Sequence, residues 1–346
     1  MQKLTRISVF VLVILLATGP PGNLAAQGSE QGVIEGQVVN ETEGGGSVAG
    51  LDVALIALVE GEVRESQTSQ TDEEGRFRFT DILVGESYLV RVCYMQIDYY
   101  YPIDFSTDET EKSIEVPVCD TTTSDQAIRV HLLHVVLRAE DGYFSVTEVM
   151  WLLNEGDKTY VGSEETSFGE IQGTLVFALP EGATDFGVPE ESVGDYFLVD
   201  NTTVTNTLVF PPGEKEIVFS YILDSPDSGE LAIELFADYP TDVLHVMVQG
   251  KDVEVASTRL TPAEPIATET GEQFIHFTGD SLARGDTVDI RLSSVPGGDD
   301  NPLFTILGAI AAVLIIGLGA YLLVRRGKAP WPTESRLPED ADTDNE

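Results

Sequence analysis

The chain is poor in basic residues, histidine and cysteine. Its 346 residues include 19 Lys and Arg against 59 Asp and Glu, which gives a formal net charge of −40. Nucleic-acid binding needs Lys and Arg to neutralise phosphates, so this composition excludes a nucleic-acid partner. Two cysteines exclude a disulfide-dense mini-scaffold and a cysteine-rich zinc module. Hydrophobic residues still make up 42% of the chain, which excludes a wholly disordered acidic protein.

The usual short catalytic motifs are also missing. The sequence has no Gly-x-Ser-x-Gly elbow, no P-loop, no His-x-x-Glu pair and no EF-hand pattern. We therefore expect a protein that is not an enzyme and that has neither a cofactor nor a bound metal ion.

The N-terminus has the pattern of an export signal. Lys3 and Arg6 precede an apolar run at 7–17, which is followed by Gly and Pro and then by Ala25 and Ala26. This order predicts a secretory signal peptide over residues 1–26. An uncleaved anchor helix is the alternative, although the apolar run is short for a membrane span.

The C-terminus has a longer apolar run. Leu303–Val324 contains no charged residue and would form a helix about 33 Å long, enough to cross a bilayer. Arg325, Arg326 and Lys328 follow at once, which places this end in the cytoplasm by the positive-inside rule. We therefore expect a single-pass plasma-membrane protein. Its N-terminal bulk would be extracytoplasmic, and residues 325–346 would form a short disordered cytoplasmic tail.

Between the two ends, short segments alternate between apolar and polar residues. This period of two is typical of half-buried strands, and Gly, Pro, Asp and Asn separate the segments. One example is the set of large apolar residues at alternate positions, which predicts one buried face: Ile217, Phe219, Tyr221 and Leu223.

The fold class expected from this pattern is all-β, with two antiparallel β-sandwich domains and one C-terminal transmembrane helix. The polar stretch 120–125 divides the sandwiches, which we place at 27–125 and 126–295. Residues 261–295 either complete the second sandwich or form a small membrane-proximal unit. Residues 296–302, rich in Pro and Gly, would link the sandwiches to the membrane span.

Residues 32–100 resemble the carboxypeptidase regulatory-like domain, a transthyretin-like sandwich with a carbohydrate-binding-like fold. Four segments carry the resemblance: Gly32–Val39, Val48–Leu55, Gln70–Phe79 and Ile82–Val90. The resemblance implies about seven strands, with a tight turn at Asp72–Gly75. The Gly-rich segment Glu41–Gly46 departs from the pattern. The metallopeptidase domain of the family is missing, so the resemblance implies no peptidase activity.

The second block is similar to a domain that accompanies such modules in single-span bacterial envelope proteins. The similar segments are Val146–Val149, Leu153–Val161, Phe177–Ala183 and Phe210–Tyr221. This similarity implies a location in the envelope and no particular activity.

Cys93 and Cys119 both belong to the segment that would be exported. An oxidising compartment allows them to form a disulfide, which would join the strands on which they lie. Two buried free thiols are one alternative, and metal or redox chemistry at this pair is another.

A tyrosine-rich segment offers the best candidate binding surface. It contains Tyr94, Asp98, Tyr99, Tyr100 and Tyr101. Aromatic faces beside carboxylates can stack on a sugar and accept its hydrogen bonds. Ordinary packing of tyrosines in a sheet is the alternative.

Histidine offers little for a metal site. His131 and His134 lie in a segment that resembles a strand, where positions three apart point to opposite faces. His245 and His276 have no Cys or His near them in sequence. We therefore expect no metal ligands among these residues.

These observations favour a non-enzymatic, membrane-anchored extracytoplasmic protein that binds another envelope protein in a structural or adhesive role. One alternative is carbohydrate binding through Tyr94 and Tyr99–Tyr101. Another is an accessory subunit of an exported redox or transport complex. The expected partners are thus the membrane and either an envelope protein or a glycan.

Overall fold

The computed structural model describes residues 31–293, apart from short gaps at 60–61, 105, 107–108, 141, 168–170, 189–195, 201, 227–228, 250–252 and 269–270. Within these ranges the chain forms strands, and the only helix is a short 3-10 turn at Glu164–Thr166. Four predicted segments lie outside the described residues: the signal peptide 1–26, the linker 296–302, the apolar run 303–324, and the tail 325–346 with Arg325, Arg326 and Lys328.

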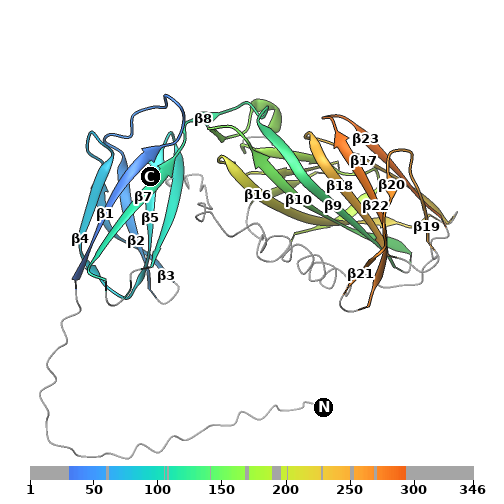
Figure 1. The fold of residues 1–346 in the computed structure, drawn as a ribbon, viewed down its shortest axis with the longest axis horizontal. Coiled ribbons are helices and arrows are strands. Elements are labelled where there is room, and N and C mark those ends of the chain that lie inside the picture. The colour runs from blue at the N-terminus through green and yellow to red at the C-terminus, as the bar shows by residue number, and fades with distance from the viewer. Residues whose placement is uncertain are drawn as a thin grey trace, which may run out of the picture.

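The first domain is a sandwich of two sheets (Figure 1). One sheet has the order β4-β1-β7 and the other β3-β2-β5-β6. Its strands are β1 (Gln31–Asn40), β2 (Asp52–Val59), β3 (Glu62–Gln70), β4 (Arg76–Leu83), β5 (Ser87–Tyr94), β6 (Ile97–Asp104) and β7 (Glu111–Val118). Both sheets contribute to one core, which includes Ile34, Leu55, Phe79, Val90 and Val118.

The turn expected at Asp72–Gly75 is present between β3 and β4. Gly75 has φ +79°, a conformation that glycine adopts without a Cβ clash. The Asp72 carboxylate accepts the backbone N–H of Glu74 at 3.0 Å and of Arg76 at 2.8 Å. These hydrogen bonds close the turn that leads from β3 in one sheet to β4 in the other.

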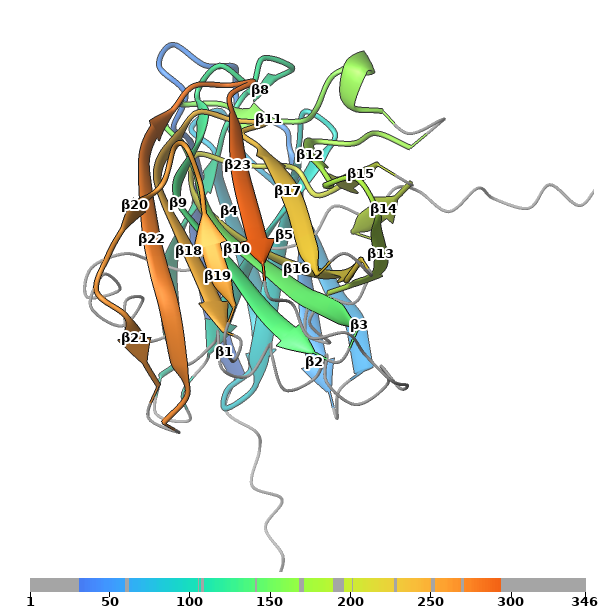
Figure 2. The same ribbon diagram turned by 90° about the vertical axis from the view of Figure 1, so that its right-hand side faces the viewer.

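The second domain is a larger sandwich. An eight-stranded sheet has the order β13-β16-β10-β9-β18-β22-β20, with β21 also paired to β22. Two smaller sheets, β12-β15-β14 and β17-β23-β19, face it, and Figure 2 shows β17, β23 and β19 in front of the large sheet. A single core joins residues of the large sheet, such as Val146 and Val246, to residues of the smaller sheets, such as Phe177 and Ile290.

The strands of this domain run from β9 to β23. Their bounds are β9 (Ile128–Glu140), β10 (Tyr143–Asn154), β11 (Thr159–Tyr160), β12 (Leu175–Ala178), β13 (Ala183–Gly187), β14 (Phe197–Val199), β15 (Thr203–Asn206), β16 (Gly213–Asp224), β17 (Glu230–Phe236), β18 (Thr241–Gln249), β19 (Glu254–Ala256), β20 (Thr261–Pro262), β21 (Ile266–Ala267), β22 (Gln273–Leu282) and β23 (Thr287–Ser293). The last four pair within this sandwich, so the residues from 261 to 293 complete it.

The expected fold class, with two antiparallel sandwiches, is wrong. The sheets are mixed rather than antiparallel, because β1 pairs with β7 and β9 pairs with β18 in parallel. Alternation shows which face of a strand is buried but not the direction of its partner, and both parallel partners are distant in sequence. In addition, no helix among the described residues is long and apolar enough to cross a membrane. The run 303–324, which suggested such a helix, lies outside them.

Candidate functional site

The tyrosine-rich segment does not form one aromatic surface. In β6, Tyr99 is only 3% exposed and points into the first sandwich, where Tyr101 also packs against the core. Tyr100 and Asp98 occupy alternate positions and therefore belong to the other face of the strand. Tyr94 is 4% exposed. Strand alternation thus divides the proposed sugar platform and leaves two of its tyrosines inaccessible to a glycan.

The expected disulfide is wrong, because Cys93 and Cys119 are both free thiols. Cys93 lies at an exposed position of β5, between inward-facing Val92 and Tyr94, whereas Cys119 is 1% exposed. The two side chains therefore occupy different environments. Burial is the main cause that raises the pKa of both thiols, that of Cys119 to about 12.

Tyr94 belongs to a polar network centred on Asp120, just after the first sandwich. One carboxylate oxygen of Asp120 accepts hydrogen bonds from the Tyr94 hydroxyl at 2.7 Å, Asn40 Nδ2 at 2.8 Å and the Gly46 N–H at 3.1 Å. The bonds from Tyr94 and Asn40 lower the pKa of Asp120. Burial, followed by this carboxylate, raises the pKa of Tyr94 to about 12.

The same network continues into the second sandwich. The Thr42 hydroxyl donates to the backbone oxygen of Asp157 at 2.7 Å, and it accepts the N–H of Asp120 at 2.9 Å. The Tyr99 hydroxyl shares a hydrogen bond of 2.8 Å with Thr159 Oγ1. We call this set the joint, and it comprises Asn40, Thr42, Gly46, Tyr94, Tyr99, Asp120, Asp157 and Thr159. The Gly-rich segment that departed from the family pattern contributes Thr42 and Gly46.

The joint also contains a short ladder of backbone bonds. β8 (Thr121–Thr122) pairs in parallel with β11 (Thr159–Tyr160). The backbone N–H groups of Thr159 and Val161 donate to the carbonyls of Asp120 and Thr122, at 2.8 and 3.0 Å. Residues 120–122, the first half of the stretch expected to be a polar boundary, are therefore hydrogen-bonded to residues 159–161.

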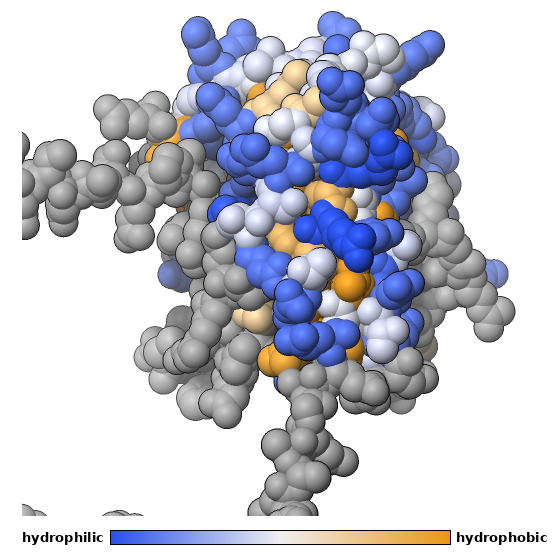
Figure 3. All heavy atoms as spheres, turned by 90° about the vertical axis from the view of Figure 1, so that its left-hand side faces the viewer, coloured by the Kyte–Doolittle hydropathy of each residue, from blue (hydrophilic) through white to orange (hydrophobic). Residues whose placement is uncertain are grey.

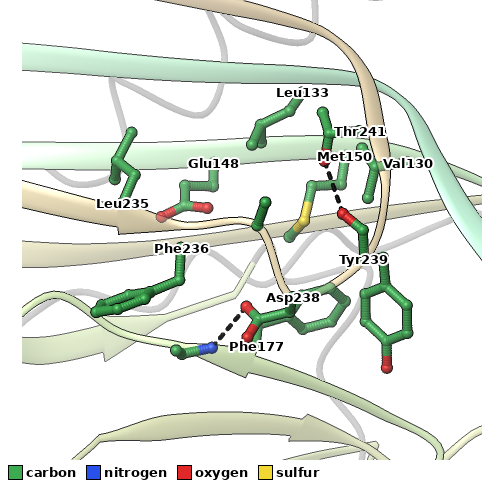
Figure 4. A pocket seen from close by; sticks show the side chains of 12 residues that line it. Val130, Leu133, Glu148, Met150, Phe177, Leu235, Phe236, Asp238, Tyr239 and Thr241 are labelled. Atoms are coloured by element: carbon green, nitrogen blue, oxygen red, sulfur yellow. Dashed lines mark hydrogen bonds between the residues drawn. The ribbon is translucent and has the colours of Figure 1, made fainter. Parts of the chain in front are cut away.

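A cavity lies inside the second sandwich, and its lining includes Glu148 on β10 and Asp238 after β17 (Figure 4). It offers about 20 Å³ to the centres of water-sized molecules, which is room for one or two waters and too little for a sugar or a peptide. The rest of the lining is largely apolar, with Met150 and Phe177 among its members.

Both acids of the cavity are poorly solvated. Glu148 accepts a hydrogen bond from the Tyr221 hydroxyl at 2.8 Å, and burial raises the pKa of Glu148 to about 7. Asp238 accepts the N–H of Ala178 at 2.9 Å, and burial raises the pKa of Asp238. A buried carboxyl can act as a general acid, but the small cavity leaves no room for a substrate beside it.

Lys215 has an unusual environment at the start of β16. Its ammonium donates to the carbonyls of Val209 at 3.0 Å and Leu208 at 3.2 Å, and it lies 5.2 Å from the centre of the Phe210 ring. Burial lowers the pKa of Lys215 to about 7. Because its partners are loop carbonyls and an aromatic ring, this lysine fastens the connection between β15 and β16.

Three histidines meet on the outer face of the eight-stranded sheet. His134 on β9 is the cross-strand partner of His245 on β18, and their ring centroids are 5.2 Å apart. His276 on β22 lies on the other side of His245, with centroids 5.0 Å apart. His131, at a bulge of β9, instead contacts Asp242 at 3.0 Å. Sequence reasoning missed this cluster, because its members come from distant strands.

Burial is the main cause that lowers the pKa of His134, to about 4, and that of His245. Both rings are therefore neutral at pH 7. In the part of the chain that the structure describes, no three His, Cys, Asp or Glu side chains are gathered as they are around a bound metal ion.

No protein-family model matches this chain, and no curated protein sequence matches it. Among solved structures, it is similar to an M1 zinc metallopeptidase from Deinococcus radiodurans, with 9% identity over 50% of this chain and 43% of that chain and a TM-score of 0.31. A mutant two-domain M1 zinc metallopeptidase bound to L-tryptophan gives 11% identity, 50% and 44% coverage, and a TM-score of 0.30. The same kind of mutant bound to L-arginine gives 11% identity, 48% and 42% coverage, and a TM-score of 0.28. The chain thus spans less than half the length of these structures, and the likeness is too low to indicate an activity.

Proposed function

We propose that the protein is a non-enzymatic binding protein of the cell envelope and that its two sandwiches bind another envelope protein as one unit. The observation that carries this proposal is the joint. Hydrogen bonds of 2.7 and 2.8 Å join Thr42 and Tyr99 to the second sandwich, and such bonds would hold the surfaces of the two domains in a fixed relation. A surface that is ordered before binding loses less entropy when a partner associates.

Two further observations agree with this proposal. The cavity beside Glu148 has room for water only, which gives no support to a small-molecule substrate there. The end of the molecule formed by the first sandwich is mainly hydrophilic, with separate small apolar areas (Figure 3). A strongly acidic protein with such a surface remains soluble and favours partners with basic or neutral surfaces.

The test compares the full-length protein with a variant whose joint is weakened. A photo-crosslinking group placed on either sandwich should capture the same envelope protein in cells. Asp120→Ala together with Thr42→Val should reduce this capture at least fivefold, while both sandwiches stay folded by circular dichroism. Capture that is equally strong in the variant, or no capture above that of an unrelated acidic protein, would refute the proposal.

The extracytoplasmic location can be tested with the exposed thiol of Cys93. A maleimide that does not cross membranes should label Cys93 on intact cells with an accessible envelope, at about pH 8.5, where more thiolate forms. Cys93→Ser is the control and should abolish the signal. Labelling that requires lysis of the cells would show that the described domains lie inside.

A further inference from the structure

The histidine cluster consists of His134, His245 and His276, on the neighbouring strands β9, β18 and β22. The sheet order places His245 in the middle, with ring centroids 5.2 Å from His134 and 5.0 Å from His276. His134 and His245 are direct cross-strand partners, so their side chains leave the sheet side by side on the same face. All three side chains are partly buried, and a charge on one ring therefore acts strongly on the next.

The cluster lies beside a weakly attached part of the sheet, residues 261–267, which we call the edge segment. Its two short strands, β20 and β21, pair with β22 over only two residues each. Pro262 and Pro265 have no backbone N–H to donate. Between them, the Ala263 N–H donates to the carbonyl of His276 at 2.8 Å. Because the edge segment has few backbone hydrogen bonds, a side-chain bond to it contributes appreciably to its attachment.

His276 supplies such a side-chain bond. Its Nδ1 lies 3.1 Å from the carbonyl oxygen of Glu264, which can only accept a hydrogen bond, so the proton of the neutral ring is on Nδ1. Nε2 of His276 then has a lone pair. Nδ1 of His245 lies 2.8 Å from this Nε2, so the neutral His245 ring must donate from Nδ1. Two hydrogen bonds in series thus connect His245 through His276 to the edge segment.

These two hydrogen bonds accommodate one added proton but not two. A proton added to Nε2 of His245 leaves both bonds in place and makes the bond to His276 charge-assisted, which strengthens it. A second proton must go to Nε2 of His276, where it would point at the N–H of His245 across 2.8 Å. Two donors cannot form a hydrogen bond with each other, and the two positive rings repel. The second proton therefore forces the rings apart.

We propose that the histidine cluster is an acid-sensitive clamp on the edge segment. It holds the segment while His245 and His276 together bind at most one added proton, and it releases the segment when a second proton turns His276 away from both of its partners. Ile266, the cross-strand partner of Phe274, would leave with the segment and uncover this ring, which is only 3% exposed in the structure. Acid would thereby change the surface that the second sandwich offers to another molecule.

The neighbours of the cluster make its protonation difficult in the closed arrangement. Burial and then the adjacent His276 lower the pKa of His245, and Asp280 on β22 opposes them. Burial, followed by His245 and His276, lowers the pKa of His134 to about 4. A histidine that is released into solvent recovers its ordinary pKa of about 6.5. Protons therefore bind the open arrangement more tightly than the closed one, so opening becomes more favourable as the pH falls below about 6.5.

Other charged groups near the cluster have partners of their own. Glu216 on β16 accepts a hydrogen bond from Trp151, which is the second ring neighbour of His134. Glu148 faces the cavity on the opposite side of the sheet. The remaining pairs on these strands are Arg138 with Glu272, and Arg129 and His131 with Asp242.

Hydrogen exchange of the full-length protein tests the clamp. Amide exchange in peptides that cover the edge segment is measured at pH 7.5 and pH 5.0 and corrected for the intrinsic pH dependence of exchange. The corrected rate should rise at least about tenfold at pH 5.0, since one histidine that is protonated only in the open arrangement can raise it by up to about 30-fold. Peptides of β10 should show no such rise, which distinguishes local opening from unfolding of the domain.

His245→Asn retains an N–H donor near the position of Nδ1 and cannot bind a proton. At pH 7.5 the edge segment of this variant should be protected as in the native protein, and the rise at pH 5.0 should disappear. The matched control is His131→Asn, which changes the one histidine outside the cluster and should leave the rise intact. Should His245→Asn fail to fold by circular dichroism, His276→Asn provides the same test, because its amide can still donate to Glu264.

Equal corrected rates at the two pH values in the native protein would overturn the proposal. A rise at pH 5.0 that persists in His245→Asn or in His276→Asn, or that disappears in His131→Asn, would also overturn it.

Discussion

The buried carboxyl of Glu148 should make the second sandwich less stable as the pH rises. Burial raises the pKa of Glu148 from 4.5 to about 7, which corresponds to about 3 kcal/mol between its two protonation states. From pH 4.5 to pH 7 the folded protein retains a proton that the unfolded chain has lost. The stabilisation associated with this proton is therefore present below pH 4.5 and is lost as the pH rises through 7.

Glu148→Gln removes this titration and retains the hydrogen bond. A glutamine has nearly the same shape, and its oxygen can still accept the Tyr221 hydroxyl, which lies 2.8 Å from the glutamate oxygen. We expect the variant and the native protein to have similar stability at pH 4.5. At pH 8 the variant should be more stable, by up to about 3 kcal/mol.

Urea unfolding of the full-length protein at several pH values measures this difference. Trp151 lies on β10, three positions from Glu148, so its fluorescence follows the second sandwich. Trp331→Phe in both proteins removes the other tryptophan from the signal. Glu214→Gln, at an exposed position of β16, is the matched control and should change nothing. A difference between Glu148→Gln and the native protein that is the same at pH 4.5 and pH 8 would refute the reasoning.

Three further predictions concern the first sandwich and the joint. Asp120→Ala removes the acceptor of three hydrogen bonds and should lower the free energy of unfolding by about 2 kcal/mol in urea titrations, whereas Asp98→Ala should have little effect. Native protein should react with one equivalent of a thiol reagent, and urea should expose the second thiol, that of Cys119; no reaction of the native protein would contradict the free thiols. Gly36→Ala places a Cβ about 2.1 Å from the Phe77 ring, so the core must rearrange at a cost of about 1–3 kcal/mol in the free energy of unfolding. The melting temperature should therefore fall, and an unchanged melting temperature would contradict this packing.

Period-two alternation predicted the strands and their buried faces well. The expected inward set on β16 is buried, since Ile217, Phe219, Tyr221 and Leu223 are between 1% and 3% exposed. Such a pattern depends only on neighbours within one strand, so the sequence shows it directly. The same reasoning could not give strand partners. The parallel pairing joins β9 to β18, although the strands from β10 to β17 lie between them in sequence. No local sequence pattern predicts such a pairing.

The prediction that Tyr94 and Tyr99 belong to a binding surface failed for a related reason. Tyr94 and Tyr99 lie within seven positions of Tyr100 and Tyr101 in the sequence, which suggested one aromatic surface. Alternation within β6 separates Tyr99 from Tyr100, and Asp120 and Thr159 then give Tyr94 and Tyr99 hydrogen-bond partners inside the molecule. Local sequence could have revealed the first of these facts. The second depends on contacts between residues that are distant in sequence.

Glu148 and the histidine cluster show which features local sequence predicts and which depend on contacts between distant strands. Glu148 occupies the same face of β10 as Val146 and Met150, so its burial follows from the alternation of side chains along one strand. A charged residue at an inward position predicts either a partner or a raised pKa, and the structure provides both in Tyr221 and the apolar cavity. The histidines give no such local signal, because their proximity depends on the order of three strands. Their clustering is thus a property of the sheet topology, which puts His245 on the central strand in ring contact with both of the others.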